Sequence, residues 1–547
     1  MSFSLKKINK TALVYDIEVK NTHTFTVGNS RMIVHNCYLP YLADTAEGLV
    51  DTLSEVNWLS MLGGGIGIGI GIRSSDEKST GIMPHLRTYD ASCLAYRQGQ
   101  TRRGSYAMYL DITHPDILLF LEMRKPTGDP NMRCQNLHHG ILIPDTFMQL
   151  IERCMLDPHI DDTWELKDPH SQEVRDKISA KELWQRILET RMQTGEPYIL
   201  FIDTANKALP EPQKQLGLKV NQSNLCAEVV LATNKDRTAV CCLSSVNLEY
   251  YDQWKTVPEF IPDIVEMLDN VLQYFIDHAP PTISRAVYSA SQERSIGIGA
   301  LGFHAFLQKH NVPWESSTAV SYNKSMFRHI KKRIDETNLK LGKERGEAPD
   351  MKGTGKRFAH TTAIAPNAST SLIMGNSSPS VEPFRANAYR QDTLSGMYVN
   401  KNRFLDAVIK KLCETDKRLD YNEIWSSIIA NDGSVQHLTC LDDTTKKVFK
   451  TAMEIDQRWI IQHAADRQEF IDQAQSINIF FRPDTNIKYL HAVHFQAWKE
   501  GLKTLYYCRS EKLMKADKIA KKIEREAIKS IDLKALTEGE TCLACEG

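Results

Sequence analysis

The stretch GGGIGIGIGI at residues 63–72 constrains the fold more than any other part of this sequence. Successive side chains of a β-strand point to opposite faces, so one face here carries isoleucines and the other carries no side chain. Such a strand lets a ligand or another backbone segment approach it closely. It is not a dinucleotide fingerprint, because the strand–turn–helix context of GxGxxG is missing.

The remaining pattern predicts an α/β protein. Between residues 37 and 510, helical and strand patterns alternate. With 42% hydrophobic and 25% charged residues, a chain of 547 residues can bury a large core. The segment from Glu511 is charged and favours helix, and we expect residues 511–547 to form a flexible tail.

Charge and hydropathy exclude several classes of function. The formal net charge of −1 offers no electrostatic footprint for nucleic acid or an anionic membrane. No apolar run approaches the roughly 18 residues of a membrane span, and the first residues lack the apolar core of a signal peptide. We therefore expect a cytoplasmic protein, in the host cytoplasm if a phage encodes it, whose cysteines are thiols.

Residues 1–36 are expected to be a small all-β segment. β-rich runs surround Val14–Val19 and Phe25–Val27, and the pair Gly28-Asn29 before Met32 is a hairpin signal.

This segment ends in three reactive side chains, His35, Asn36 and Cys37. The side-chain amide of Asn36 can attack its own backbone carbonyl and form a succinimide, which releases the polypeptide that begins at Cys37. His35 can protonate the leaving group, and Cys37 can accept an acyl group. The alternative is a surface loop in which this tripeptide occurs by chance.

The context of the tripeptide favours the chemical interpretation. VYDIEVKNTHTF at residues 14–25, followed by a hairpin and VHNC, resembles the C-terminal motifs of inteins. The resemblance implies that Asp16 and His23 assist cyclisation of Asn36 and that His35, Asn36 and Cys37 are the terminal splice residues.

An intein also needs an N-terminal half with the first nucleophile, and Met1 lies too close to Cys37 to provide one. Residues 1–36 therefore resemble the C-terminal fragment of a split intein. We expect the half carrying the N-intein on another polypeptide, joined by trans-splicing to residues 37–547.

Two cysteine-bearing segments suggest a second chemistry. In NQSNLCAEVV, residues 221–230, a strand would place Asn224, Cys226 and Glu228 on one face. The alternative is a half-buried strand edge, since cysteine is often a small buried hydrophobe. In AVCCLSSVNLEY, residues 239–250, a strand points Cys241 and Cys242 to opposite faces, so at most one joins the Cys226 site.

Three further motifs remain open from the residues alone. PNASTS, residues 366–371, suits a helix N-terminus that binds phosphate, or an ordinary capped helix. The adjacent Tyr506 and Tyr507 would pack in a core if they have no other role. Cys542 and Cys545 form a CxxC that is a dithiol, half of a zinc site, or idle; the chain has no second CxxC to complete a zinc site.

Together these segments resemble the large (alpha) subunit of class I ribonucleotide reductases. The ordered motifs that carry the resemblance from Cys37 to Gly547 are CYLPYLADTAEGLVDTL, GGGIGIGI, RQGQTRRGS, NLCAE, CCLSSVNL, PNASTS, NDGSVQ, FIDQAQSIN and GLKTLYY. The resemblance implies a ten-stranded α/β barrel of the ribonucleotide reductase type over residues 37–510. The implied activity is reduction of ribonucleoside diphosphates to deoxyribonucleotides.

The resemblance also implies roles for the redox residues. A thiyl radical on Cys226 would abstract the 3′ hydrogen, Glu228 would act as base on the 3′-hydroxyl, and Asn224 would bind the substrate. Cys37 and Cys241 would deliver electrons and become a disulfide, which the tail thiols reduce by exchange; these tail thiols are Cys542 and Cys545. Cys37 would thus act first in splicing and later in reduction.

Further sites follow from the same resemblance. Tyr506 and Tyr507 would carry the radical from a separate metal-containing small (beta) subunit. Substrate phosphates would bind at Ala368, Ser369 and Thr370. The residues that would contact a dNTP or ATP effector at a homodimer interface are Asp44, Arg73 and, in the loop Arg97–Ser105, Arg102. The chain itself would bind no metal or cofactor, and thioredoxin or glutaredoxin would be the reductant.

Two rival interpretations stay open. A cobalamin-dependent class II reductase shares the barrel and cysteines, but that class has no small subunit for Tyr506 and Tyr507 to serve. The other rival is a splicing module attached to a non-catalytic remnant. Because the family's N-terminal region, including any ATP cone, is not found here, we expect residues 1–547 alone to be inactive.

Overall fold

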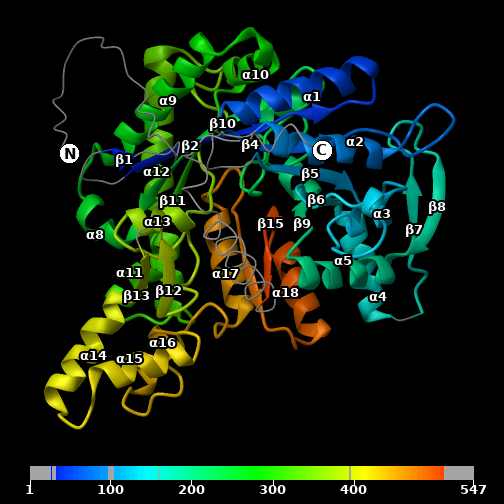
Figure 1. Cartoon of the computed structure of the whole chain (residues 1–547). Coiled ribbons are helices and arrows are strands. Elements are labelled where there is room, and N and C mark those ends of the chain that lie inside the picture. Colours follow the sequence, from blue (N-terminus) through cyan, green and yellow to red (C-terminus); the bar gives the residue numbers. More distant parts are fainter. Residues whose placement is uncertain (1–25, 28–31, 97–103, 158, 394–395, 511–547) are drawn as a thin grey trace, which may run out of the picture.

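A ten-stranded sheet with helices packed against it dominates the computed structural model (Figure 1). The structure describes residues 26–27, 32–96, 104–157, 159–393 and 396–510. The sheet follows the order β11-β10-β2-β4-β5-β6-β9-β15, with β1 beside β2 and β3 beside β4. Its strands are β1 (Thr26–Val27), β2 (Met32–Leu39), β3 (Tyr41–Leu42), β4 (Gly65–Ile70), β5 (Tyr106–Asp111), β6 (His138–Ile143), β9 (Tyr198–Phe201), β10 (Ala239–Asn247), β11 (Ile296–Leu301) and β15 (Thr504–Leu505).

The sheet consists of two blocks of opposite direction. Strands β2, β4, β5, β6 and β9 run parallel to one another, and β10 and β11 are parallel to each other. The β10–β2 and β15–β9 pairings are antiparallel and join the blocks. The helices connecting parallel strands pack on the outer face, as the alternating pattern of the sequence predicts.

Two irregular extended segments join the ends of this sheet. In the first, Thr362 bridges Ile298 of β11, and Ile364 bridges Gln475 of the second segment. The second segment is in turn hydrogen-bonded to Tyr506, the residue that follows β15: the Tyr506 N–H donates to the Ile477 carbonyl at 2.9 Å. The backbone hydrogen bonds therefore run around the sheet from β11 back to β15, which makes a barrel.

The glycine face of β4 is where a loop crosses the barrel interior. A Cβ atom at Gly67 would lie 1.9 Å from the Ser223 carbonyl oxygen and 2.6 Å from Asn224 Cα. The expectation that another backbone approaches the side-chain-free face is confirmed. The opposite face carries Ile66 and Ile68, which are fully buried in the main apolar core beneath the helices.

Several of the helices that pack against the sheet begin or end with recognisable capping residues. Ser316 caps α12, the longest helix, by accepting a hydrogen bond from the Ala319 N–H, and Gly195 ends α5 in the left-handed conformation. The helices outside the lobe described next are α1 (Ala46–Met61), α2 (Ile82–Ala95), α3 (Ile117–Glu122), α4 (Asp145–Leu156), α5 (Ala180–Thr194), α6 (Ile202–Lys207), α7 (Glu211–Gln215), α8 (Tyr251–Trp254), α9 (Phe260–His278), α10 (Ser284–Glu293), α11 (Phe303–Lys309), α12 (Ser317–Arg345), α13 (Ala368–Ile373), α17 (Gln457–Gln468) and α18 (Ile487–Lys499).

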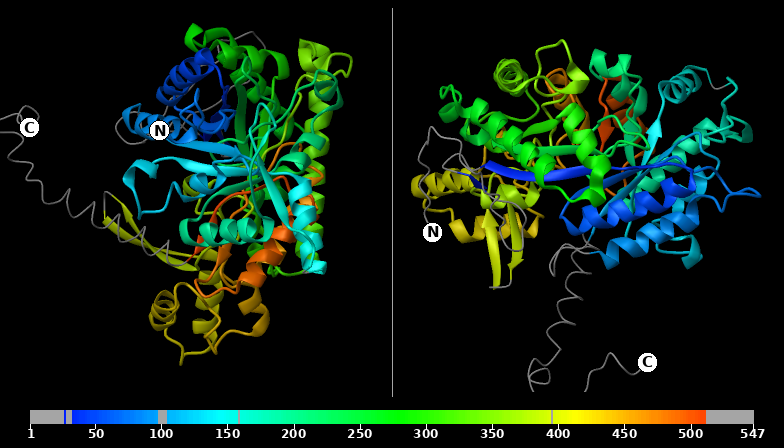
Figure 2. Two further views of the ribbon diagram at one scale, coloured as in Figure 1. Left: turned by 90° about the vertical axis from the view of Figure 1, so that its right-hand side faces the viewer. Right: turned by 90° about the horizontal axis from the view of Figure 1, so that it is seen from above.

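A smaller lobe projects from the barrel in all three views (Figures 1 and 2). It has its own apolar cluster, centred on Leu405, Ile409, Trp425 and Phe449. Its elements are β12 (Ala388–Thr393), β13 (Gly396–Lys401), α14 (Arg403–Thr415), α15 (Tyr421–Ala430) and α16 (Asp443–Val448). Two further two-stranded sheets lie outside the barrel path, β7 (Thr163–Lys167) with β8 (Val174–Ser179) and β14 (Ile479–Phe481) with β16 (Cys508–Ser510).

The predicted hairpin near the N-terminus is confirmed in its strand pairing. Val27 of β1 lies opposite Met32 of β2 in antiparallel register. No separate all-β unit is evident among the few described residues before Cys37. The predicted boundary between residues 36 and 37 instead falls within β2, where Asn36 pairs with Cys242 and Cys37 pairs with Cys241.

Several predicted site residues lie outside the described residues: Asp16, His23, Arg102, Cys542 and Cys545. For His35 and Asn36 the backbone alone is described. In the part of the chain that the structure describes, no helix combines the length and the apolarity that crossing a bilayer requires.

Candidate active site

The predicted strand at residues 221–230 is wrong, because the segment is a loop inside the barrel. An antiparallel bridge between Val220 and Ala232 joins the two ends of the loop. The chain turns at Ala227, which has a φ of 62°. The Ala227 N–H donates to the Asn224 carbonyl at 3.3 Å, which closes the turn. A strand needs a free neighbour to pair with, and the interior of a closed barrel offers none.

The loop nevertheless brings the three predicted side chains together through Asn224. The Asn224 side-chain oxygen accepts the backbone N–H groups of Glu228 at 3.0 Å and Val229 at 3.1 Å. Its amide donates to Cys37 Sγ at 3.1 Å. The Tyr109 hydroxyl donates to the Asn224 carbonyl at 2.7 Å and holds the loop from the β5 side. Asn224 thus sets the loop beside Cys37.

Glu228 is a fully buried acid at the centre of the site. Its Oε2 accepts the Ser476 hydroxyl at 2.9 Å, and the Cys37 thiol points at Oε1 from 3.9 Å. Burial raises the pKa of Glu228 to about 7, because the hydrogen bonds from Asn224, Ser476 and Cys37 offset only part of the desolvation. A carboxyl group with a pKa near neutrality can both take and return a proton.

Cys37 and Cys241 are direct cross-strand partners on β2 and β10. Both lie in the apolar cluster inside the barrel, whereas Cys242 lies in the core beneath the helices, which confirms the prediction of opposite faces. Burial raises the pKa of the Cys37 thiol well above its usual value, and the nearby Glu228 and Cys226 raise it further. Burial also raises the pKa of Cys241, against a hydrogen bond from Gln473 Nε2 at 3.5 Å. Both are therefore neutral thiols at pH 7.

Tyr506 and Tyr507 lead from this site toward the surface. Their ring centroids are 4.2 Å apart, and Tyr506 is 7% exposed. Burial raises the pKa of Tyr506 well above its usual value, and its hydroxyl also interacts with the Cys226 thiol and with Tyr507. Cys226, Tyr506 and Tyr507 thus form one contiguous path.

The predicted helix N-terminus at PNASTS is confirmed, since α13 begins at Ala368. Asn367 anchors its start by donating to the Ser245 hydroxyl at 3.1 Å and the Ala365 carbonyl at 3.0 Å. Ala368 and Ser369 are exposed and Thr370 is half-buried, so the first backbone N–H groups and hydroxyls can be reached by a ligand.

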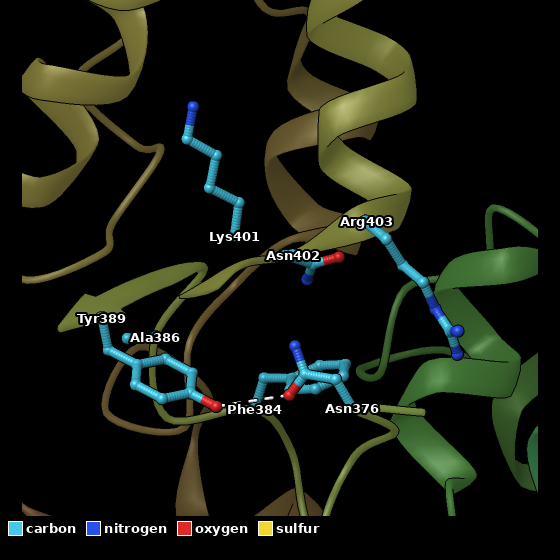
Figure 3. Close-up of a pocket in the computed structure, with 7 residues that line it drawn as sticks. All are labelled: Asn376, Phe384, Ala386, Tyr389, Lys401, Asn402 and Arg403. Carbon is cyan, nitrogen blue, oxygen red and sulfur yellow. Dashed lines mark hydrogen bonds between the residues drawn. The ribbon is translucent and has the colours of Figure 1, made fainter. Parts of the chain in front are cut away.

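A small hollow lies beyond this helix, where the lobe meets the barrel (Figure 3). In it the Tyr389 hydroxyl donates to Asn376 Oδ1 at 3.3 Å. The cavity volume is about 10 Å³, room for about one water molecule. The cysteines do not line it; its lining residues are Asn376, Phe384, Ala386, Tyr389, Lys401, Asn402 and Arg403.

Two of the predicted effector residues lie together at the surface. The guanidinium Nε of Arg73 is 2.8 Å from Asp44 Oδ2, and the Arg73 backbone N–H donates to the same oxygen at 3.4 Å. His170, which the sequence did not single out, approaches that oxygen at 3.3 Å from the β7–β8 connection.

Other side chains of the site were also missed by sequence reasoning. Ser476 binds both the Glu228 carboxylate and, at 2.5 Å, the Cys226 carbonyl. Gln473 donates to Cys241 and, at 2.9 Å, to the Ile296 carbonyl. Both belong to FIDQAQSIN, so a dense run of amide and hydroxyl residues was the available signal. Tyr198 also belongs to the site, since its ring centroid is 4.7 Å from that of Tyr506, but no sequence pattern pointed to it.

The arrangement combines a proton-transfer group with three thiols around one interior point. Glu228, Cys37 and Cys226 interact electrostatically, and Cys241 on β10 lies directly opposite Cys37 on β2. Two neutral thiols in cross-strand register can together supply two electrons and two protons and become a disulfide. The described residues therefore place two facing thiols, a buried acid and a pair of adjacent tyrosines at one site.

Comparison with known proteins identifies the family. The family model described as "Ribonucleotide reductase, barrel domain" matches residues 35–354 and 349–508. The chain is 51% identical to the ribonucleoside-diphosphate reductase large subunit of Invertebrate iridescent virus 3, over 93% of this chain and 87% of that protein. It is 47% identical to the putative large subunit of Frog virus 3, over 94% and 87% respectively.

A solved structure agrees with the sequence relatives. The alpha subunit of the class Id ribonucleotide reductase of Actinobacillus ureae superposes with a TM-score of 0.76 at 34% identity. The superposition covers 87% of this chain and 83% of that chain. The predicted barrel type is thus supported, and the chain belongs to the ribonucleotide reductase large-subunit family.

Proposed function

We propose that this chain is the catalytic part of a ribonucleoside-diphosphate reductase large subunit, and that its first residues are a splicing segment. The reductase function is supported by the named relatives and by family membership over most of the chain. The single observation that carries the site assignment is the register of Cys37 opposite Cys241, beside the loop that holds Asn224, Cys226 and Glu228.

The residue roles follow from the chemistry of removing a 2′-hydroxyl. A thiyl radical on Cys226 takes the hydrogen atom from C3′ of the substrate, and Glu228 takes the proton of the 3′-hydroxyl. The 2′-hydroxyl leaves as water with a proton from one thiol of the Cys37–Cys241 pair. That pair supplies two electrons and ends as a disulfide, after which Cys226 returns the hydrogen to C3′. Asn224 hydrogen-bonds the substrate.

The radical reaches Cys226 through Tyr507 and Tyr506 from a metal-containing small subunit. The contiguous path of these side chains supports this route over the cobalamin-dependent alternative, in which no external radical arrives. The Tyr507→Phe substitution decides between them, because phenylalanine cannot carry the electron and proton. Turnover that survived Tyr507→Phe would favour the cobalamin-dependent class.

The remaining assignments complete the enzyme. Substrate phosphates bind at the start of α13, through the Ala368 backbone and the hydroxyls of Ser369 and Thr370. The effector, a dNTP or ATP, binds near Asp44 and Arg73 at the interface of a homodimer. Arg102, in the loop Arg97–Ser105, relays the identity of the effector to the substrate base. In the cytoplasm, Cys542 and Cys545 pass electrons to the Cys37–Cys241 disulfide from thioredoxin or glutaredoxin.

The splicing segment acts at the Asn36–Cys37 bond. Asn36 cyclises with help from His35, Asp16 and His23, and Cys37 accepts the upstream polypeptide carried by a partner with the N-intein. The family match begins at residue 35, next to this junction, which supports a boundary there. Residues 34–36 pair with β10, so a polypeptide joined to Cys37 would take the same place in the sheet.

Mass spectrometry of the native protein tests the splicing proposal. If the peptide spanning Cys37 begins with a sequence other than VHN, the junction has been spliced and the working enzyme is the joined chain. If every such peptide reads VHNCYLPYL, the Asn36 chemistry does not occur in the cell.

A nucleotide reduction assay of the joined chain with its small subunit tests the reductase function separately. Deoxyribonucleotide formation that requires Cys241 supports it. A folded, spliced product without turnover would instead favour a splicing module on a non-catalytic remnant.

A further inference from the structure

A buried lysine stands at the start of the tyrosine segment, residues 503–507. Lys503 is 4% exposed and comes directly before Thr504, where β15 begins. Its backbone carbonyl accepts the Phe201 N–H at 2.8 Å, which fixes the main chain of Lys503 to the sheet. A lysine is almost never fully buried unless partners satisfy its charge, so the contacts of this ammonium group show what the residue does.

The ammonium group of Lys503 binds three successive backbone carbonyls. Nζ donates to the Asp472 carbonyl at 2.5 Å, to the Gln473 carbonyl at 2.6 Å and to the Ile471 carbonyl at 3.4 Å. These carbonyls belong to the second of the irregular segments that join the ends of the sheet, residues 471–478, which we call the closing segment. An ammonium group has three N–H donors and no acceptor, so the three carbonyls match its full capacity.

Lys503 keeps its charge at neutral pH. Burial lowers the pKa of Lys503 to about 8, although the nearby Asp472 carboxylate raises it. Burial would raise the pKa of Asp472, but attraction to Lys331 and hydrogen bonds such as that from the Thr362 N–H lower it to about 2. At pH 7, Lys503 is therefore a cation with all three N–H donors, beside an ionised carboxylate.

The closing segment brings two side chains to the thiols and the buried acid. Gln473 donates to Cys241 Sγ at 3.5 Å, and Ser476 donates to Glu228 Oε2 at 2.9 Å. Lys503 binds the backbone carbonyl of the same Gln473 whose side chain contacts Cys241. A displacement of the closing segment would therefore move both contacts of the site.

A neutral side chain shares part of this hold on the closing segment. Gln468 Nε2 donates to the Ile471 carbonyl at 2.8 Å and to the Gln473 carbonyl at 3.3 Å. Lys503 also binds the Asp472 carbonyl between them, and it makes the shorter contact with the Gln473 carbonyl. Because hydrogen bonds from a charged donor are roughly twice as strong as neutral ones, Lys503 contributes the larger share.

We propose that Lys503 is a positioning residue of the reductase site, whose ammonium group holds the closing segment so that Ser476 meets Glu228 and Gln473 meets Cys241. Lys503 acts through the segment and not on the reacting atoms. Burial raises the pKa of Glu228 to about 7, and the hydrogen bond from Ser476 keeps it from rising further. Correct placement of the segment thus keeps more of the base ionised near pH 7. This inference rests on the proposed reductase function.

The protonation of Glu228 reports the placement of Ser476 without any need for turnover. The infrared band of the protonated Glu228 carboxyl is identified in the full chain by its loss in Glu228→Gln, and its intensity is followed against pH. Lys503→Met removes all three donors and keeps an unbranched side chain. Glu228 should then bind its proton about tenfold more tightly, as in Ser476→Ala, because each variant costs the carboxylate one hydrogen bond.

A double variant tests whether Lys503 acts through Ser476. Adding Lys503→Met to Ser476→Ala should change the proton affinity of Glu228 no further, because the two substitutions remove the same interaction. In the assembled reductase, kcat of Lys503→Met should fall on the order of 10²-fold, the cost of misplacing site groups by about 1 Å. The KM for the nucleotide should stay unchanged, because the phosphate site proposed at α13 is not on the closing segment.

Two further variants separate positioning from general stabilisation. Lys503→Gln keeps two N–H donors on a shorter, neutral side chain and should shift the proton affinity of Glu228 by less than Lys503→Met does. It also serves as the test variant if unfolding curves show that Lys503→Met does not fold. The matched control is Lys499→Met on α18, where the lysine side chain is 45% exposed and pairs with Glu152 at 2.6 Å. This control should behave as wild type.

The outcomes separate this inference from the function on which it rests. A folded Lys503 variant with the wild-type proton affinity at Glu228, or a further change on adding Lys503→Met to Ser476→Ala, overturns the positioning role. A shift of the same size in Lys499→Met overturns it as well. Absence of turnover in the assembled wild-type enzyme would instead overturn the reductase function, while the infrared titration would still decide the role of Lys503.

Discussion

At the residue scale, the environment of Glu228 makes its protonation sensitive to pH near neutrality. Burial raises its pKa to about 7. The acid is therefore mostly protonated below pH 7 and mostly ionised above it, and only the ionised form can act as a base.

The first prediction concerns turnover. Wild-type kcat/KM should rise with pH through about 7, as Glu228 ionises. Glu228→Gln should lower turnover by roughly 10²–10⁴-fold and remove this rise, because an amide cannot accept the proton. Initial rates between pH 6 and 8.5 measure both effects. A Glu228→Gln enzyme that kept the rise would show that another group produces it.

The second prediction concerns stability and follows from the sign of the same shift. The folded pKa lies above the unfolded value, so the native state binds this proton more tightly. The contribution is fully present below the unfolded pKa and is lost as pH rises through about 7. At pH 8 the free energy of unfolding of Glu228→Gln should therefore exceed that of wild type by on the order of 3 kcal/mol. At pH 5 the difference should be much smaller. Glu211→Gln, at an exposed side chain, should show no such difference.

At the element scale, the close packing of β4 on the interior loop depends on glycine. Gly65 and Gly67 face the same side of β4, but their surroundings differ. A Cβ at Gly67 would overlap the loop backbone, whereas a Cβ at Gly65 would lie 3.6 Å from Leu225, an ordinary contact.

The third prediction uses this pair. Gly67→Ala should destabilise the protein by about 1–3 kcal/mol and displace the loop that carries Glu228. Gly65→Ala, the matched control, should be tolerated. Thermal unfolding and turnover of the two variants decide. Equal behaviour would mean that the loop can shift away from β4 without loss.

The tyrosine segment is tied to α5 by a buried arginine. Arg191 is fully buried and donates to the Tyr506 carbonyl at 2.9 Å, to His494 Nε2 at 2.9 Å and to the Pro197 carbonyl. Burial lowers the pKa of Arg191 to about 10, which leaves it charged at pH 7. The helix thus fixes the backbone at Tyr506.

The fourth prediction concerns this anchor. Arg191→Met should destabilise the protein by about 3 kcal/mol, because it leaves buried acceptors without a donor. Arg186→Met, on the same helix but 41% exposed and paired with Glu122, should cost less than about 1 kcal/mol. Denaturant unfolding curves measure both values. Similar costs for the two variants would show that the buried acceptors find other donors.

At the scale of the whole molecule, the two proposed activities, splicing and reduction, would share Cys37 but differ in their other requirements. Asn36→Ala should leave the bond between residues 36 and 37 intact in every molecule, because alanine cannot cyclise. Cys241→Ser should leave splicing unchanged and abolish nucleotide reduction by the joined chain. Intact-mass measurement and the reduction assay separate the two. A Cys241→Ser chain that failed to splice would link Cys241 to the junction chemistry.

Much of the architecture was predictable because short-range sequence patterns determine it. The glycine alternation at 63–72 predicted a face open to another backbone, and Ser223 and Asn224 approach it. The adjacent cysteines at 241 and 242 predicted opposite faces, and they lie in different clusters. Strand period and turn residues act over a few positions, so one sequence suffices to read them.

The site itself was predictable only in part. Asn224, Cys226 and Glu228 were grouped correctly, but by a strand that does not exist; the loop turns at Ala227 with positive φ. An alanine gives no local signal for that conformation, which its tertiary hydrogen bonds must impose. The partner of Glu228, Ser476, is 248 positions away, and no local pattern joins them.

The sequence by itself determined the α/β class, the family resemblance and the cysteines and tyrosines of the site, because residue type and short-range periodicity encode them. Only the tertiary structure decided that irregular segments join the ends of the sheet, that Gln473 and Ser476 complete the site, and that Lys503 binds the segment that carries them. These contacts join residues far apart in the chain, and their energies arise only when burial brings polar groups together in a low-dielectric interior.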